Sequence, residues 1–214
     1  MAVGKFLEKE KINQAEFKSS SKYFSEEARK DGVYRQKSWP FCLPRSHAEE
    51  NLFEGIRGPA IDFFKSHEIK WHDGENGKPS NHLCDSQVCC VNFLFPFAQN
   101  SQALTELLRP LFPNIQKMLP IEDGLFVSFE WIGKENYLNE GNALNGKRTR
   151  GANFTSADAA VMFERTDGKC RNDRDKGPLL ERLLAAGDHR CQIDHPVKPF
   201  FVIDARHDMF ARGL

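Results

Sequence analysis

The chain has 214 residues, of which 40% are hydrophobic and eighteen are phenylalanine, so it can bury one substantial core. Thirty lysines and arginines balance thirty aspartates and glutamates, which excludes the global positive field of many nucleic-acid-binding proteins and leaves only a local basic patch for that role. No apolar stretch has the length of a signal peptide or a membrane span, so we expect no membrane association.

The cysteines indicate a reducing compartment. None of the six forms a CxxC pair, and a disulfide scaffold would not readily use adjacent cysteines, so we expect reduced thiols in a cytoplasmic protein. A zinc site is conceivable but matches no common ligand spacing, and its candidate ligands are better interpreted as ordinary residues: His72, His82, Cys84, Cys89 and Cys90. A Cys–His nucleophilic pair is no more specific.

The first 46 residues are polar with scattered aromatic residues, and we interpret them as an arm laid over a core. One helix signal stands out in this arm. Ser25 is a suitable N-cap, Glu26 and Glu27 suit the first turn, and Gly32 is a suitable end.

Residues 47–65 have helical spacing, although Pro59 is expected to split or kink the segment. A turn-rich loop follows at residues 73–80. Residues 84–97 are apolar nearly all round, which predicts a helix buried in the middle of the fold. Gln87 and Asn92 are then polar groups inside it, and we expect them to be hydrogen-bonded core amides.

Residues 104–111 continue with helical spacing, and Ile115, Met118 and Leu119 suggest a further short turn before Pro120. Residues 124–132 are the first convincing strand, with Ser128 and Glu130 on one face. Helices followed by strands predict a mixed α/β (α+β) domain.

The segment from residue 155 to 165 reads as a strand in which Asp158 lies among small and apolar residues. Both faces of this strand are expected to be buried or half-buried. An ionised carboxylate in such a place is costly without a partner, and a divalent cation is one such partner. The alternative is a strand-entry turn, Ser156-Ala157-Asp158, whose carboxylate accepts hydrogen bonds from backbone amides.

Two strands close in sequence, carrying Glu130 and Asp158, would naturally pair and bring two carboxylates to one site. Paired carboxylates hold Mg²⁺ and leave water on the ion for hydrolysis. The densest basic cluster of the chain immediately precedes the Asp158 strand, and Lys147, Arg148 and Arg150 would supply phosphate contacts there.

Three runs carry a resemblance to a known family: residues 82–96, 129–133 and 150–160. They resemble a bacterial family of restriction endonucleases that is assigned to the PD-(D/E)XK nuclease superfamily, over roughly residues 39–169. The resemblance implies an αβββαβ core with a mixed sheet flanked by helices. It implies that Asp158 is the first metal-binding carboxylate, and that an acidic residue, one further residue and a lysine follow on the next strand. DNA is the implied partner, Mg²⁺ the implied cofactor, and a homodimer stays open.

The sequence departs from this pattern after the hairpin signal Asp167-Gly168, because no Glu-x-Lys follows on a strand. The best substitute is Asp204, at the end of the apolar run 200–203, with Arg206 where lysine belongs. Arginine keeps its proton and cannot act as a base. We therefore divide the chain into an N-terminal helical arm (1–46), a nuclease-like core (47–169) and a divergent tail (170–214).

Two functions from different classes remain open at this point. One is a metal-dependent DNA endonuclease that uses Asp158, Glu130 and Asp204. The other is a non-catalytic binding or interaction protein that retains the nuclease scaffold. A tail with no strand beside Asp158 would favour the second.

Overall fold

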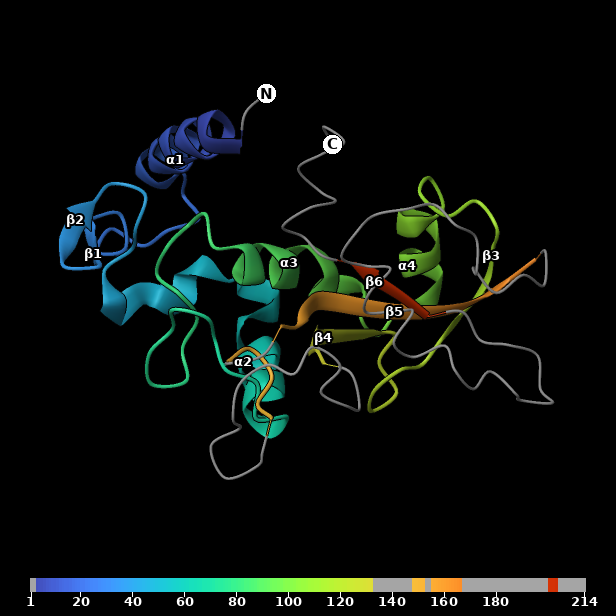
Figure 1. Ribbon diagram of the computed structural model, residues 1–214. Helices are drawn as coiled ribbons and strands as arrows, with labels where there is room; N and C mark the ends of the chain where they lie inside the picture. Colours follow the sequence, from blue (N-terminus) through green and yellow to red (C-terminus); the bar gives the residue numbers. More distant parts are fainter. Residues whose placement is uncertain (1–2, 133–147, 153–154, 167–199, 204–214) are drawn as a thin grey trace. The chain divides into compact units, whose positions relative to one another are not determined.

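The computed structural model describes residues 3–132, 148–152, 155–166 and 200–203 (Figure 1). The chain falls into two compact units, one formed by Met1–Phe95 with Thr149–Ala152 and the other by Pro96–Arg148 with Asn153–Leu214. Helices combine with small antiparallel sheets, so the α/β (α+β) class is confirmed. The boundaries expected at residues 46 and 169 stay predictions. No helix in the described ranges is long and apolar enough to cross a membrane.

The first unit begins with helix α1 (Val3–Ser20), a helix within the predicted arm for which we identified no signal in the sequence. Lys18 near its end is buried, and its Nζ donates to the carbonyl oxygens of Lys30 and Cys42 at 3.0 and 2.9 Å. Asp31 lies 3.5 Å from the same nitrogen. These contacts satisfy the buried ammonium and attach the end of the helix to two later segments.

The helix expected from Ser25 onward is a set of turns instead. Ser25 does act as a cap, since its Oγ accepts from the backbone N–H of Ala28 at 3.3 Å. The segment cannot continue as a helix because Gly32 begins strand β1 (Gly32–Tyr34), where its N–H donates to the carbonyl of Cys42 at 3.0 Å. Strand pairing overrides the local helix signal here.

A short hairpin joins β1 to β2 (Lys37–Trp39) in antiparallel register. The two residues at its tip, Arg35 and Gln36, have φ values of 46° and 65°. Two successive positive φ angles are typical of the two-residue turns that match strand twist, but they normally require Asn or Gly. The tip therefore carries backbone strain.

Residues 45–66 form two 3-10 helices, η1 (Arg45–Asn51) and η2 (Glu54–Ile56), followed by α2 (Arg57–Ser66). The expected interruption at Pro59 is misplaced. Pro59 is the third residue of α2, and an N–H at this position would have no intrahelical acceptor, so the helix loses no hydrogen bond there. The helical path is interrupted before Pro59, between η1 and α2.

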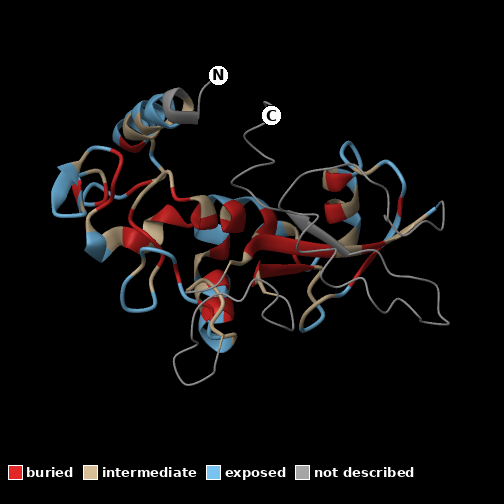
Figure 2. Ribbon diagram, in the orientation of Figure 1, coloured by how far each residue is buried: buried red, intermediate tan, exposed pale blue. Residues whose placement is uncertain are grey.

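Helix α3 (Ser86–Leu94) confirms the helix expected in residues 84–97, with Asp85 as its N-cap, and η3 (Phe95–Phe97) follows it. It is not buried all round, because Cys89 is exposed and Phe93 is 42% exposed (Figure 2). The two amides within it are hydrogen-bonded, as expected. Gln87 bonds to the backbone of Lys70 and His72, and Asn92 bonds to the backbone of Asn51 and Phe53.

The second unit contains helix α4 (Ser101–Leu108) and a four-stranded sheet of β3 (Ile115–Leu119), β4 (Val127–Trp131), β5 (Ala157–Arg165) and β6 (Phe200–Ile203). The short turn expected at residues 115–119 is wrong, because this segment is β3. Its apolar spacing suits either structure, and pairing with β5 decides for the strand.

Strand β5 is the centre of this sheet (Figure 1). It pairs with β3 through residues 162–165, with β4 through residues 157–161 and with β6 through residues 159–162. Because β4 and β6 pair with the same stretch, they lie along opposite edges of β5. All these pairings are antiparallel, whereas the expected sheet was mixed.

Candidate functional site

Strand β5 holds Asp158 in a buried position. The residues from Ala157 to Val161 are all buried, and Asp158 itself is only 6% exposed. The interpretation of this segment as a strand with both faces covered is therefore confirmed. Small alanine side chains surround the acid and leave no other charged group beside it along β5 until Glu164.

Glu130 lies directly across from Asp158 on β4. The register pairs Phe129 with Ala159 and Trp131 with Ala157, which leaves Glu130 and Asp158 as the residues between these two pairs. Opposed residues of antiparallel strands are neighbours across the sheet. The pairing of β4 with β5 therefore places the backbones of Glu130 and Asp158 opposite each other, and a shared site for their carboxylates stays a prediction.

Glu130 has a conformation that strands rarely contain. Its φ is 48°, in the left-handed region, and it is 5% exposed. Irregular strand residues of this kind redirect a side chain, and they persist only where the surroundings hold them. Position 130 itself carries a glutamate, not the glycine or asparagine that would have signalled this geometry.

Serine hydroxyls extend the polar character of this site. Ser156, two residues before Asp158, donates its hydroxyl to Oε2 of Glu130. Ser128, two residues before Glu130, donates to Oε2 of Glu122 at 2.9 Å. Sequence reasoning missed Ser156 as a site residue, although its spacing of two from Asp158 places both on one face of an extended strand.

Burial has an electrostatic cost for both Asp158 and Glu130 if they are ionised. An ionised carboxylate is costly to bury, and a second carboxylate beside it adds like-charge repulsion. A proton or a metal ion relieves both terms. Within the described ranges, no three His, Cys, Asp or Glu side chains gather as a metal cluster. Mg²⁺ commonly takes one or two protein carboxylates and completes its shell with water and phosphate oxygens, so a magnesium site at Glu130 and Asp158 stays a prediction.

The sequence model of one protein family, described as Restriction Endonuclease associating with ARP, matches residues 10–169. The chain belongs to this family. The match includes both acid-bearing strands and ends at Lys169, two residues after the start of the Asp167-Gly168 hairpin signal. No curated protein and no solved structure matches the chain.

The remaining site candidates of this restriction-endonuclease-related chain are less well placed. Arg148 and Arg150 are both half-buried, and the carbonyl of Arg150 accepts a hydrogen bond from the N–H of Lys70 at 3.0 Å. Lys147 and Asp204 lie outside the described residues. Strand β6 ends at Ile203, which pairs with Ala159, so a strand from the tail does lie beside the Asp158 segment.

Two cysteines of this family member, Cys42 and Cys84, have raised thiol pKa values and are therefore poor nucleophiles. Burial raises the pKa of Cys42 to about 11 and that of Cys84 to about 12. Both thiols therefore stay protonated at neutral pH, and the thiolate is the reactive form. The structure offers no support for the zinc alternative, because the described part of the chain contains no cluster of three or more metal-ligating side chains.

His82 should make stability depend on pH. Burial lowers the pKa of its imidazole below the ordinary value of 6.5, and its Nδ1 accepts the N–H of Cys84 at 3.0 Å. The unfolded chain then binds the proton more readily than the folded chain. Stability is complete above about pH 6.5 and falls as the pH drops toward the lower folded pKa.

We expect His82→Asn to flatten this acid-side loss, because the asparagine Oδ1 can keep the bond to Cys84 without titrating. Urea unfolding at pH 7.5 and pH 5.5 measures the difference. Parallel losses in the two proteins would show that His82 is not the titrating group.

Proposed function

We propose that this chain is a metal-dependent DNA endonuclease of the PD-(D/E)XK superfamily, which hydrolyses a phosphodiester with Mg²⁺ held by Asp158 and Glu130. The observation that carries the proposal is the buried pair of opposed carboxylates on β4 and β5. Membership of a restriction-endonuclease-related family supports DNA as the substrate.

The residues of the site have distinct proposed roles. Asp158, fixed by the central strand, would hold the ion, and Glu130 would provide a second ligand from the neighbouring strand. Ser156 orients the Glu130 carboxylate through its hydroxyl. When bound, Mg²⁺ would stabilise the charge that develops on the phosphate and activate water for attack.

Phosphate contacts are assigned to the basic loop before β5. Lys147, Arg148 and Arg150 would hold the DNA backbone, which fits a chain whose overall charge is balanced and whose basic residues must act locally. These contacts would position the DNA without reading its sequence.

Strand β6 supports the endonuclease over a non-catalytic remnant, because the tail provides a strand beside the Asp158 segment. Asp204 follows Ile203 in the sequence, and Ile203 pairs with the neighbour of Asp158. We therefore propose Asp204 as the third acid, in place of the missing Glu-x-Lys. Arg206 can contribute charge but not base catalysis.

The test is Mg²⁺-dependent cleavage of bacteriophage DNA, which presents short recognition sequences many times. We expect cleavage by the wild-type chain with Mg²⁺, none in EDTA, and a loss of about 10²-fold or more in Glu130→Gln. The matched control is Glu164→Gln, an acid of β5 that pairs with Lys117 and lies away from the carboxylate pair. Binding of DNA with no cleavage in any divalent metal would overturn the endonuclease and favour the non-catalytic alternative.

A further inference from the structure

A second potential site lies wholly within the first unit. A cavity of about 280 Å³ is lined by α1, the β1–β2 hairpin and the segments that contain Phe41 and His82. Its size is at the lower end of the range for ligand pockets, which suits one flat ring system with its substituents.

The charge on this cavity is one-sided. Lys11, Arg35 and Lys37 contribute to the lining, and no carboxylate does. Arg35 lies 3.8 Å from Asp73 and Lys11 pairs with Glu8, but none of the ion pairs found in the described ranges involves Lys37. An anionic group would therefore meet uncompensated positive charge here.

Aromatic rings form the rest of the lining: Tyr34, Trp39, Phe41 and His82. His82 packs edge-on against Tyr34 and Phe41 with both centroid distances at 5.0 Å, and Trp39 lies 5.2 Å from Phe41. Trp39 and Tyr34 are only half-buried. A planar ligand can thus gain stacking area on a wall that is already assembled.

The wall is held in place by the backbone. Leu43 and Leu83 donate N–H bonds to the carbonyls of Asn81 and Phe41 at 2.8 and 3.1 Å. The buried Asn81 amide also bonds to the carbonyl of Leu43 at 2.6 Å. The strained hairpin tip contributes Arg35 to the lining of the cavity, and such strain is typical of ligand-binding positions.

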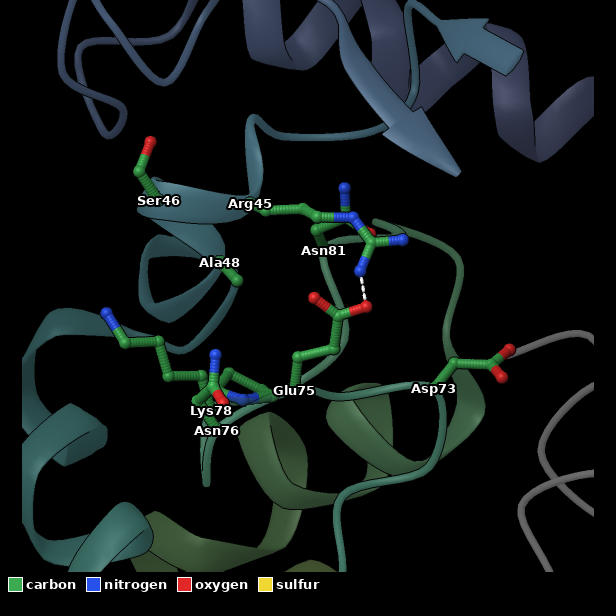
Figure 3. A pocket seen from close by; sticks show the side chains of 9 residues that line it. Arg45, Ser46, Ala48, Asp73, Glu75, Asn76, Lys78 and Asn81 are labelled. Atoms are coloured by element: carbon green, nitrogen blue, oxygen red, sulfur yellow. Dashed lines mark ion pairs between the residues drawn. The ribbon is translucent and has the colours of Figure 1, made fainter. Parts of the chain in front are cut away.

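A second cavity in the first unit has a different lining from the aromatic one. It has a volume of about 220 Å³, but acids and bases share its lining, and Arg45 and Glu75 form an ion pair across it (Figure 3). Its charges satisfy each other. Of these two cavities, the one at the hairpin combines aromatic rings with Lys37, a cation for which no ion pair is found within the described ranges.

We propose that this aromatic cavity binds one unpaired nucleotide of a DNA strand, with the base stacked on its rings and the flanking phosphates contacted by Lys11, Arg35 and Lys37. Base–aromatic stacking beside a basic groove is how proteins hold single-stranded nucleic acid. The choice of DNA as the polymer rests on the proposed function. The unpaired base would be a strand end or a base displaced from the duplex, both of which expose a ring face.

The experiment measures binding of a labelled single-stranded DNA to the full chain in EDTA by fluorescence anisotropy, with the matching duplex and an RNA strand as competitors. EDTA removes metal-dependent cleavage from the readout, so failure of binding here and failure of cleavage are separate results. We expect the single strand to bind more tightly than the duplex or the RNA, with quenching of Trp39 fluorescence.

Two variants of exposed or half-buried residues test the contacts without disturbing the core. Trp39→Leu should weaken single-strand binding about 10-fold, and Lys37→Gln should reduce the salt dependence by about one phosphate contact. Lys65→Gln is the matched control, because it removes one exposed cation of α2 and no lining residue, so its affinity should equal wild type. Wild-type affinity in both test variants, or equal effects on duplex and single strand, would overturn the proposal, as would stronger competition by RNA.

Discussion

Asp158→Asn is expected to abolish Mg²⁺-dependent DNA cleavage and to raise the stability of the metal-free protein. The asparagine keeps the shape of the side chain but removes a buried charge that faces Glu130 across β4 and β5. Loss of a metal ligand should cost about 10³-fold or more in rate. Removal of like-charge repulsion should stabilise the apo state by roughly 1 kcal/mol or more.

The two readouts together separate the metal site from a purely structural acid. Cleavage assays measure the first, and thermal unfolding with and without Ca²⁺, which binds carboxylates, measures the second. If the Asp158 carboxylate is instead held by backbone amides, Asp158→Asn should destabilise the protein and should leave any Ca²⁺-dependent shift unchanged. Glu164→Gln is again the matched control, because Glu164 lies on the same strand away from the pair.

Gly151→Ala is expected to cost about 2–4 kcal/mol of folding stability. Gly151 has φ of 68°, and an added Cβ would lie 2.1 Å from the carbonyl oxygen of Lys70. That carbonyl accepts the Gln87 amide at 3.1 Å. The methyl group would therefore strain the turn and also separate the hydrogen-bonded segments at Lys70 and Arg150.

Gly77→Ala isolates the part of this effect that comes from the positive φ angle alone. Gly77 has φ of 76°, but nothing lies within 4 Å of its hypothetical Cβ, so this variant should lose only about 1 kcal/mol. Urea unfolding of both variants gives the comparison. Equal losses of unfolding free energy in the two variants would mean that the backbone at Lys70 can move away from the new methyl group without destabilising the protein.

The Asp158 strand could be predicted from the sequence because its pattern is local. A run of small and apolar residues with one acid has few structural interpretations, and the close spacing of two strands made their pairing the natural expectation. The position of Glu130 opposite Asp158 follows from that pairing. The left-handed backbone at Glu130 does not, because only its neighbours in space hold it there.

Other features could not be predicted, either because the sequence lacks the usual signal or because its pattern fits more than one secondary structure. The hairpin at residues 32–39 has Arg35 and Gln36 at its tip instead of the asparagine and glycine that usually mark such a turn. Ile115 to Leu119 has apolar spacing that suits a helical turn as well as a strand, and only β5 resolves it. The aromatic cavity joins Trp39 to His82, which lie far apart in the sequence, so no local pattern could reveal it.

The conformation of Glu130 has a consequence for laboratory evolution. Glycine or asparagine would occupy its left-handed backbone with less strain than glutamate. A library selected for heat resistance alone should therefore enrich those two residues at position 130, whereas selection for the proposed DNA cleavage should retain the acid. Opposite enrichments at this single codon would reveal a trade-off between thermal stability and activity at position 130.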